Sequence, residues 1–140
     1  MFYVGNLNET NGSNDYVAYC FAEVEGYSKF GTYVGTSNFP FINCGFRPAF
    51  IILKPYDLGS GWYLYDSTRG EYNGVNMRLL AESPAAETSV AGNEIDILSN
   101  GFKLRGAYNS GSNYSGASYV FCAWAEHPFG GDGVSPATAR

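Results

Sequence analysis

The carboxylates in the middle of the chain are the first candidates for chemistry, because a glycosidase needs two carboxyl groups that flank the scissile bond. They are Asp57, Asp66, Glu71, Glu82, Glu87, Glu94 and Asp96. Any folded acidic protein offers such pairs, so their presence alone predicts no catalysis. Glu94 and Asp96 lie on either side of Ile95, and in an extended segment they share one face while Ile95 and Ile97 point inward. We expect that face to be a solvated edge and the chain not to be an enzyme.

Asp66 and Arg69 follow directly after the apolar residues 62–65. A carboxylate in this position accepts backbone N–H bonds in a turn and pairs with a guanidinium group. We therefore expect Asp66 and Arg69 to build a turn. Sugar sites commonly combine aromatic platforms with such polar groups, so a polar anchor for a carbohydrate is the alternative interpretation of the same pair.

Three tyrosines, Tyr72, Tyr108 and Tyr114, lie in loops rich in Gly, Asn and Ser. A large aromatic side chain is hard to bury in such a loop, and Tyr offers a rigid amphipathic contact surface. These residues are the best candidates for contacts with a ligand or a protein partner. The alternative is that they pin the loops to the body of the protein or to a neighbouring subunit.

The residues that usually bind metals are too few and too scattered here. His127 is the single histidine, and the three cysteines, Cys20, Cys44 and Cys122, contain no Cys-x-x-Cys spacing. We expect no metal and reduced, buried thiols, although a disulfide between Cys20 and Cys122 is conceivable if their strands are neighbours. The glycine-rich residues 130–133 lack the Lys of a phosphate-binding loop, so we expect no cofactor.

The composition indicates one folded domain made of strands. The chain has 140 residues, of which 45% are hydrophobic and 15% charged, and its 12 Tyr, 10 Phe and 18 Gly suit short strands joined by glycine turns. The net charge of -5 argues against nucleic acid as a partner. No apolar run is long enough to insert into a membrane, and residues 1–5 lack the pattern of a secretion signal, so we expect a protein that stays in the cytoplasm where it is made.

Alternating apolar segments separated by polar turns predict an all-β, antiparallel β-sandwich of jelly-roll type with little or no helix. The expected strands are residues 16–23, 32–35, 49–54, 62–65, 76–80, 102–105 and 119–125. Residues 49–54 are apolar at nearly every position between Pro48 and Pro55, so we expect a central strand that is buried on both faces. Residues 82–93 lack helical spacing and are expected to form a loop.

One apolar segment occurs twice. Residues 16–23 (YVAYCFAE) match residues 119–126 (YVFCAWAE) at four of eight positions. The match reflects either similar strand composition or a duplicated unit; on the second interpretation, residues 1–26 end a preceding repeat, residues 27–127 form the sandwich domain and residues 128–140 are a flexible tail. An apolar strand cannot stay an exposed edge, so we expect the segment bearing Tyr16, Val17, Tyr19 and Phe21 to control assembly, either beside residues 119–126 or in a neighbouring subunit.

Several segments together resemble a known family. They are residues 16–31 (YVAYCFAEVEGYSKFG), 45–50 (GFRPAF), 62–70 (WYLYDSTRG), 98–105 (LSNGFKLR), 121–125 (FCAWA), 127–129 (HPF) and 136–140 (PATAR). In order and spacing they resemble the β-rich repeat domain of tailed-bacteriophage structural proteins, especially tail-fibre-like ones. The likeness spans nearly the whole chain and departs at the N-terminus, where only the last strand and turn of a preceding repeat remain. It implies a virion component and no catalytic residues.

The resemblance leads us to expect a non-enzymatic virion protein, a tail-fibre or tail-associated domain that contacts a host surface glycan or protein. Its expected partners are other virion proteins and further copies of itself, with a trimer favoured, and its expected location is the virion, assembled in the cytoplasm of the bacterial host. A capsid decoration protein is the first alternative. A soluble carbohydrate-binding module is the second, and a glycosidase the most distant.

Overall fold

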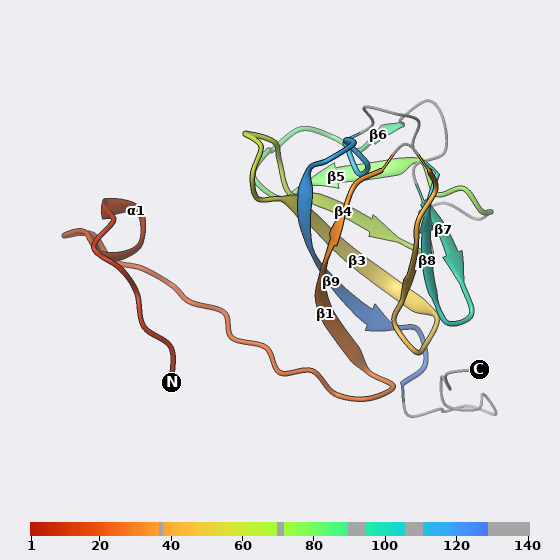
Figure 1. Cartoon of the computed structure of the whole chain (residues 1–140), viewed down its shortest axis with the longest axis horizontal. Coiled ribbons are helices and arrows are strands. Elements are labelled where there is room, and N and C mark those ends of the chain that lie inside the picture. Colours follow the sequence, from red (N-terminus) through yellow and green to blue (C-terminus); the bar gives the residue numbers. More distant parts are fainter. Residues whose placement is uncertain (37, 70–71, 90–94, 106–110, 129–140) are drawn as a thin grey trace.

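The computed structural model describes residues 1–36, 38–69, 72–89, 95–105 and 111–128. Within them the protein is an all-β sandwich of two antiparallel sheets, as the sequence predicts, with one short helix, α1 (Asn8–Asn11), in the N-terminal segment (Figure 1). The larger sheet has the order β1 (Ser28–Val34), β9 (Ser118–Ala125), β3 (Pro48–Pro55), β4 (Tyr63–Asp66), β5 (Met77–Leu80) and β6 (Thr88–Ser89). The smaller sheet has the order β2 (Phe41–Asn43), β8 (Gly101–Leu104) and β7 (Ile95–Leu98).

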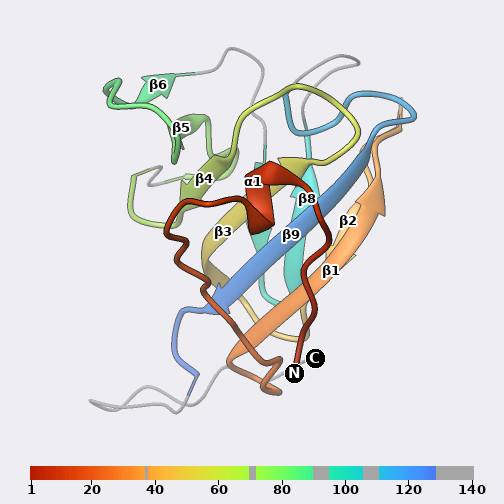
Figure 2. The ribbon, with the colours of Figure 1, turned by 90° about the vertical axis from the view of Figure 1, so that its left-hand side faces the viewer.

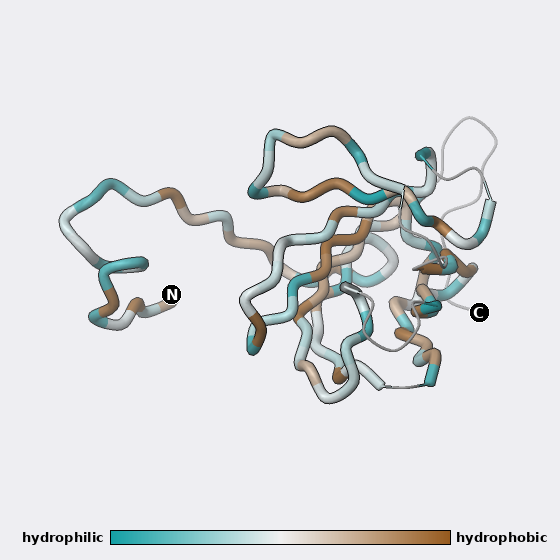
Figure 3. The backbone as a smooth tube through the Cα atoms, turned by 90° about the horizontal axis from the view of Figure 1, so that it is seen from above, coloured by the Kyte–Doolittle hydropathy of each residue, from teal (hydrophilic) through white to brown (hydrophobic). Residues whose placement is uncertain are grey.

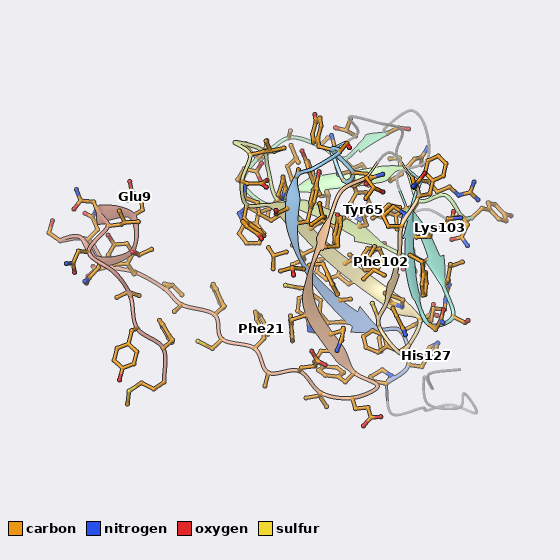
Figure 4. The ribbon with its side chains drawn as sticks, in the orientation of Figure 1. Glu9, Phe21, Tyr65, Phe102, Lys103 and His127 are labelled. Carbon is orange, nitrogen blue, oxygen red and sulfur yellow. The ribbon has the colours of Figure 1, made fainter. Side chains whose placement is uncertain are left out.

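The core lies between the two sheets and follows from strand alternation. Every second residue of β9 is buried, and its partners from β3 and β8 are buried with it. Phe102 of the smaller sheet and Phe121 of the larger one meet edge to face, with their ring centroids 5.5 Å apart. Figure 4 shows Phe102 and Tyr65 pointing into this interior from the two layers. Burial of these rings is what holds the layers together.

The expected central strand is β3, which begins at Pro48, ends at Pro55 and lies between β9 and β4. The expectation that it is buried on both faces is wrong. Ile51 and Leu53 are fully buried, whereas Phe50 and Ile52 on the other face are only half-buried. The second layer of strands covers one face of the large sheet, so the apolar residues of the other face have no sheet above them.

The remaining predicted strands correspond to β1, β4, β5, β8 and β9 with shifted ends. In β8 the predicted alternation is confirmed, because Phe102 and Leu104 are buried while Lys103 is half-buried. The sequence analysis missed β2, β6 and β7, which are short, and β6 lies inside the predicted loop of residues 82–93. Of the predicted tail, residues 129–140 lie outside the described residues.

The prediction of a strand at residues 16–23 is wrong. These residues form no strand; with residues 1–15 they make an N-terminal arm (residues 1–23) that extends away from the sandwich (Figure 1). The place expected for them beside β9 is filled, because β1 pairs with β9 on one side and β3 pairs with it on the other. The strand that neighbours β9 is therefore the one that follows the arm in sequence.

Candidate assembly surface

The arm leaves the sandwich at a tight turn whose contacts fix its direction. Val24 and Ser28 form an isolated antiparallel bridge, and the backbone N–H of Ser28 donates to the Val24 carbonyl at 2.8 Å. The Ser28 hydroxyl accepts from the Val24 N–H at 3.1 Å and donates to the Ala22 carbonyl at 3.2 Å. Glu23 pairs with Lys29 at 2.5 Å, and this ammonium group lowers the pKa of the Glu23 carboxyl by hydrogen bonding. Residues 22–24 are thus tied to the start of β1.

Beyond this root the arm is apolar and exposed. Residues 16–22 carry no charged side chain, and the side chains of Val17, Tyr19 and Phe21 are 79%, 82% and 63% exposed. Figure 3 shows these apolar stretches outside the body of the sandwich. Such a run of large apolar residues in water is characteristic of a surface that another molecule covers.

The far end of the arm has a small structure of its own. The Tyr16 hydroxyl accepts from the Gly12 N–H at 2.9 Å and donates to the Asn8 carbonyl in α1. Tyr16 therefore closes a loop around α1 and is not available as a strand residue in this arrangement. The extended part of the arm consists of residues 17–23.

The second apolar surface is the outer face of the six-stranded sheet, the face turned away from the smaller sheet. Residues that alternate with the buried ones in β3, β4 and β9, together with Phe30 of β1, form its apolar centre, and the pairing register places them side by side: Phe30, Phe50, Ile52, Leu64, Val120, Cys122 and Trp124. Two charged residues lie on the same face, Lys54 opposite Val120 and Asp66 opposite Phe50. All are half-buried. An antiparallel sheet with one solvated face normally carries polar residues there, so this face has the composition of an interface.

An aromatic cluster joins the two surfaces. Trp124 stacks on Phe50 with centroids 5.7 Å apart and meets Phe30 edge to face at 5.8 Å. Phe21 of the arm meets Trp124 edge to face at 5.7 Å and stacks on Phe30 at 5.9 Å. Figure 4 shows Phe21 where the arm begins to separate from β1. The sequence analysis named Phe21 but not the three sheet residues as members of a site. The apolar run of residues 49–53 is a signal for Phe50, because it leaves no polar face there.

Asp66 and Arg69 build the turn that the sequence predicts. Asp66 Oδ1 accepts the backbone N–H groups of Thr68 at 2.9 Å and Arg69 at 2.8 Å, and Asp66 Oδ2 accepts Arg69 Nε at 2.6 Å. Arg69 also donates to Glu87 at 2.8 Å, and its hydrogen bonds to Glu87 and Asp66 raise the pKa of the guanidinium group. The pair is therefore satisfied by turn contacts, and Glu71, another candidate carboxylate, lies outside the described residues.

The two candidate tyrosines that the structure describes, Tyr72 and Tyr114, have different surroundings. Tyr72 is 82% exposed, beside Asn73, whose side chain bonds both the N–H and the carbonyl of Ile97 at 3.0 Å. Tyr114 is half-buried in a depression of about 410 Å³. The depression is lined by Asp57, Leu58, Tyr114, Ser115, Gly116 and Ala117. Tyr108 lies outside the described residues.

The Asp66 turn and the Tyr114 depression lie at opposite ends of β3. Asp66 pairs across the strands with Phe50, near the start of β3, whereas Asp57 follows the end of β3 and accepts the Ser118 N–H at 2.7 Å. Asp66 and Arg69 therefore do not share a site with Tyr114.

The expectation that Glu94 and Asp96 lie on a solvated edge is wrong for Asp96. Ile95 and Ile97 point inward as predicted, but Asp96 is also buried and its Oδ2 accepts Arg105 Nε at 2.5 Å. The guanidinium group compensates the charge of the carboxylate, which is the usual condition for burying one, while Asp96 Oδ1 has no hydrogen-bond partner among the described residues. Its companion Glu94 lies outside the described residues, so the structure does not describe the proposed carboxylate pair.

The three thiols are free, and only part of the expectation for them is confirmed. Cys44 is buried, and burial raises the pKa of its thiol to about 12. Cys122 is half-buried on the outer face, where burial also raises its pKa. Cys20 is exposed on the arm, contrary to the expectation, because residues 16–23 are not part of the sheet.

Two further features concern metals and membranes. Among the residues that the structure describes, no three His, Cys, Asp or Glu side chains gather as ligands of a metal ion would. In the same part of the chain, no helix combines the length and the apolar character needed to cross a membrane.

Comparison with known proteins places this architecture in one family. The model of a domain of unknown function, DUF7483, matches residues 1–128, which include both the arm and the sandwich. No curated protein and no solved structure matches the chain. Since the match covers most of its length, the chain belongs to the DUF7483 family.

Proposed function

We propose that this chain is a non-enzymatic structural protein of a tailed-bacteriophage virion, a tail-fibre or tail-associated domain that works by assembly. One observation carries the assembly part of this proposal: an uncharged, apolar segment, residues 16–22, is held away from its own sandwich and exposed to water. A protein that acts alone in solution does not benefit from such a segment, whereas a subunit covers it on joining its neighbours.

The placement in a phage particle is supported by the sequence resemblance of residues 16–31, 45–50, 62–70 and 98–105 to tail-fibre-like proteins. In this setting the sandwich is a rigid building block and the arm a connector to other virion proteins and further copies, with a trimer as the expected state. Tyr72, exposed on a loop anchored by Asn73, is the candidate contact for a host surface glycan or protein.

The absence of catalysis is also part of the proposal. It is supported by the way two of the candidate carboxylates are used: Asp66 is engaged by two N–H groups and a guanidinium group, and Asp96 is buried with Arg105 as its partner. A general acid or base needs access to a substrate proton. A carboxylate held by a turn, as Asp66 is, and one that is buried, as Asp96 is, have little such access.

Immunogold labelling of purified phage particles whose genome encodes this chain tests the proposal. Labelled tails or fibres are expected. Labelled heads favour the capsid decoration alternative, and an abundant chain in the lysate that is absent from washed particles overturns the virion proposal. Polysaccharide hydrolysis by the purified chain overturns its non-enzymatic part.

A further inference from the structure

We propose that the arm of one copy of this chain lies on the outer face of the six-stranded sheet of a second copy. The inference deepens the proposed function, on which it rests, by naming the partner of the arm and the surface that receives it. Two apolar surfaces of the same chain, the arm and the outer face, are at least partly exposed to solvent. Each can bury the other in an apolar contact.

The apolar part of the arm and the β9 part of the outer face are both uncharged, and the extended arm is long enough to cross several strands. Residues 16–22 of the arm carry no charge, and the face-forming positions of β9 between Val120 and Trp124 carry none either. An extended arm from residue 17 to residue 23 spans roughly 20 Å, at about 3.3 Å per residue. That length suits a course across several strands, which lie about 4.8 Å apart.

The contacts of Phe21 show how an arm residue packs on this face. Its ring lies within 6 Å of both Phe30 and Trp124, in stacked and edge-to-face geometries that aromatic rings favour. Phe21 is nevertheless 63% exposed, so the contact is incomplete in a single copy. A second arm that crosses the same face would cover Phe21 and Trp124 together.

The root of the arm favours a second copy over the arm's own face. The Ser28 hydroxyl holds Ala22 and Val24, and the Glu23–Lys29 ion pair fixes the next residue. From this fixed root the arm separates from the sheet, as Figure 1 shows, and Figure 2, turned by 90°, shows the arm in front of the six-stranded sheet. Beyond Phe21, the side chains of Val17 and Tyr19 are 79% and 82% exposed, so the chain's own sheet does not cover them, and contact with a neighbour leaves the root in place.

Each copy then donates one arm and offers one face. A head-to-tail contact of this kind closes into a ring of copies when the rotation between neighbours permits, and otherwise continues as a filament. The trimer expected for a fibre is one such closed ring. Burying the arm also removes the exposed apolar run that otherwise invites non-specific association.

Trp124 reports on this contact directly because it lies at its centre. In the full chain carrying Trp62→Phe, all tryptophan emission comes from Trp124, since the chain has 2 Trp. Sedimentation and emission are measured on the same samples over a range of concentrations. We expect the mass to rise to a whole multiple of the monomer while the emission of Trp124 shifts to the blue over the same concentrations.

Paired variants then identify the two sides of the contact. Tyr19→Ser removes an arm side chain that is 82% exposed, and Ile52→Lys places a charge on the outer face. Each should weaken self-association about tenfold or more, because a large apolar side chain contributes about 1.5–3 kcal/mol when buried. The same two substitutions at Phe41, an exposed residue of the smaller sheet, are the controls and should leave association unchanged.

Mixing the two variants gives the sharpest result. The Ile52→Lys copy has an intact arm and the Tyr19→Ser copy an intact face, so one productive contact remains and a 1:1 complex is expected that grows no further. A mixture that stays monomeric overturns the inference, provided that circular dichroism shows both variants folded. Blue-shifted Trp124 emission that stays the same at every protein concentration also overturns the inference. That result would show that the chain's own arm covers Trp124.

Association without any shift of Trp124 also overturns the inference, because it indicates strand addition at the open edge of β1 or an unrelated contact. The inference and the proposed function fail separately. A chain that is found in phage particles but never associates with itself refutes the inference and keeps the proposed function. A chain that exchanges arms with other copies but is absent from phage particles supports the inference and refutes the proposed function.

Discussion

Tyr119 links β9 to the loop that carries Tyr114, and its removal tests how the sandwich holds that loop. Its ring is fully buried and stacks on Tyr33 with centroids 4.7 Å apart and an interplanar angle of 2°. Its hydroxyl accepts the Tyr114 N–H at 2.9 Å and donates to the Gly111 carbonyl at 3.0 Å. Tyr119→Phe keeps the stacked ring and removes both hydrogen bonds.

The expected loss in the free energy of unfolding at neutral pH is about 1–3 kcal/mol, because a buried N–H and a carbonyl lose their partner. Burial raises the pKa of Tyr119 to about 12, from the ordinary value of 10.0. A group with a raised folded-state pKa stabilises the protein fully below its unfolded pKa and loses that contribution as pH rises toward the folded value. For Tyr119 the window therefore runs from about pH 10 to about pH 12.

Over this window the Tyr119 contribution falls by about 2–3 kcal/mol, at about 1.4 kcal/mol for each pKa unit. The advantage of the wild type over Tyr119→Phe should therefore be smaller by about 1.4 kcal/mol at about pH 11, one unit into the window, and should disappear toward pH 12. Urea unfolding of both proteins at neutral pH and at about pH 11 measures it, and phenolate absorbance follows the titration. A stability difference that stays constant with pH, or an unchanged stability at neutral pH, would refute this account of Tyr119.

Three smaller predictions concern other parts of the sandwich. In Gly35→Ala the new Cβ would lie 2.1 Å from the Tyr114 carbonyl oxygen, so the backbone must shift and unfolding should become easier by about 1–3 kcal/mol in urea titrations. Asp66→Asn should cost about 0.5–1.5 kcal/mol through its turn contacts. Loss of glycan binding without any loss of stability would instead favour the sugar-site interpretation. A thiol reagent should label exposed Cys20 at once and buried Cys44 only on unfolding; equal labelling rates would contradict the burial of Cys44.

The elements that the sequence predicts well are those with local signals. β3 begins at Pro48 and ends at Pro55, and its apolar run favours a position in the middle of a sheet, which is where it lies. The turn at Asp66 and Arg69 is also local, since every group that it needs lies within three residues. In both cases the residues that determine the structure are neighbours in the sequence, so few conformations satisfy them.

What the sequence could not decide is which segment becomes the partner of β9. Residues 16–23 have the stronger strand composition, yet β1, with its Lys and two small residues, pairs with β9 along its full length. Pairing depends on contacts across the whole chain, which no local pattern records. Asp96 was misplaced for a similar reason, because its burial depends on Arg105, the partner that a neighbouring strand supplies.

The central claim is that the arm is an assembly element, and the mass of the full chain in solution tests it most directly. Sedimentation equilibrium of the wild type and of the arm variant Tyr19→Ser, compared over the same concentrations, is the measurement. The account predicts a closed oligomer, a trimer in the expected fibre, for the wild type and a marked shift to monomer for the variant. A wild-type chain that remains monomeric at every concentration, or two proteins that associate equally, would contradict it.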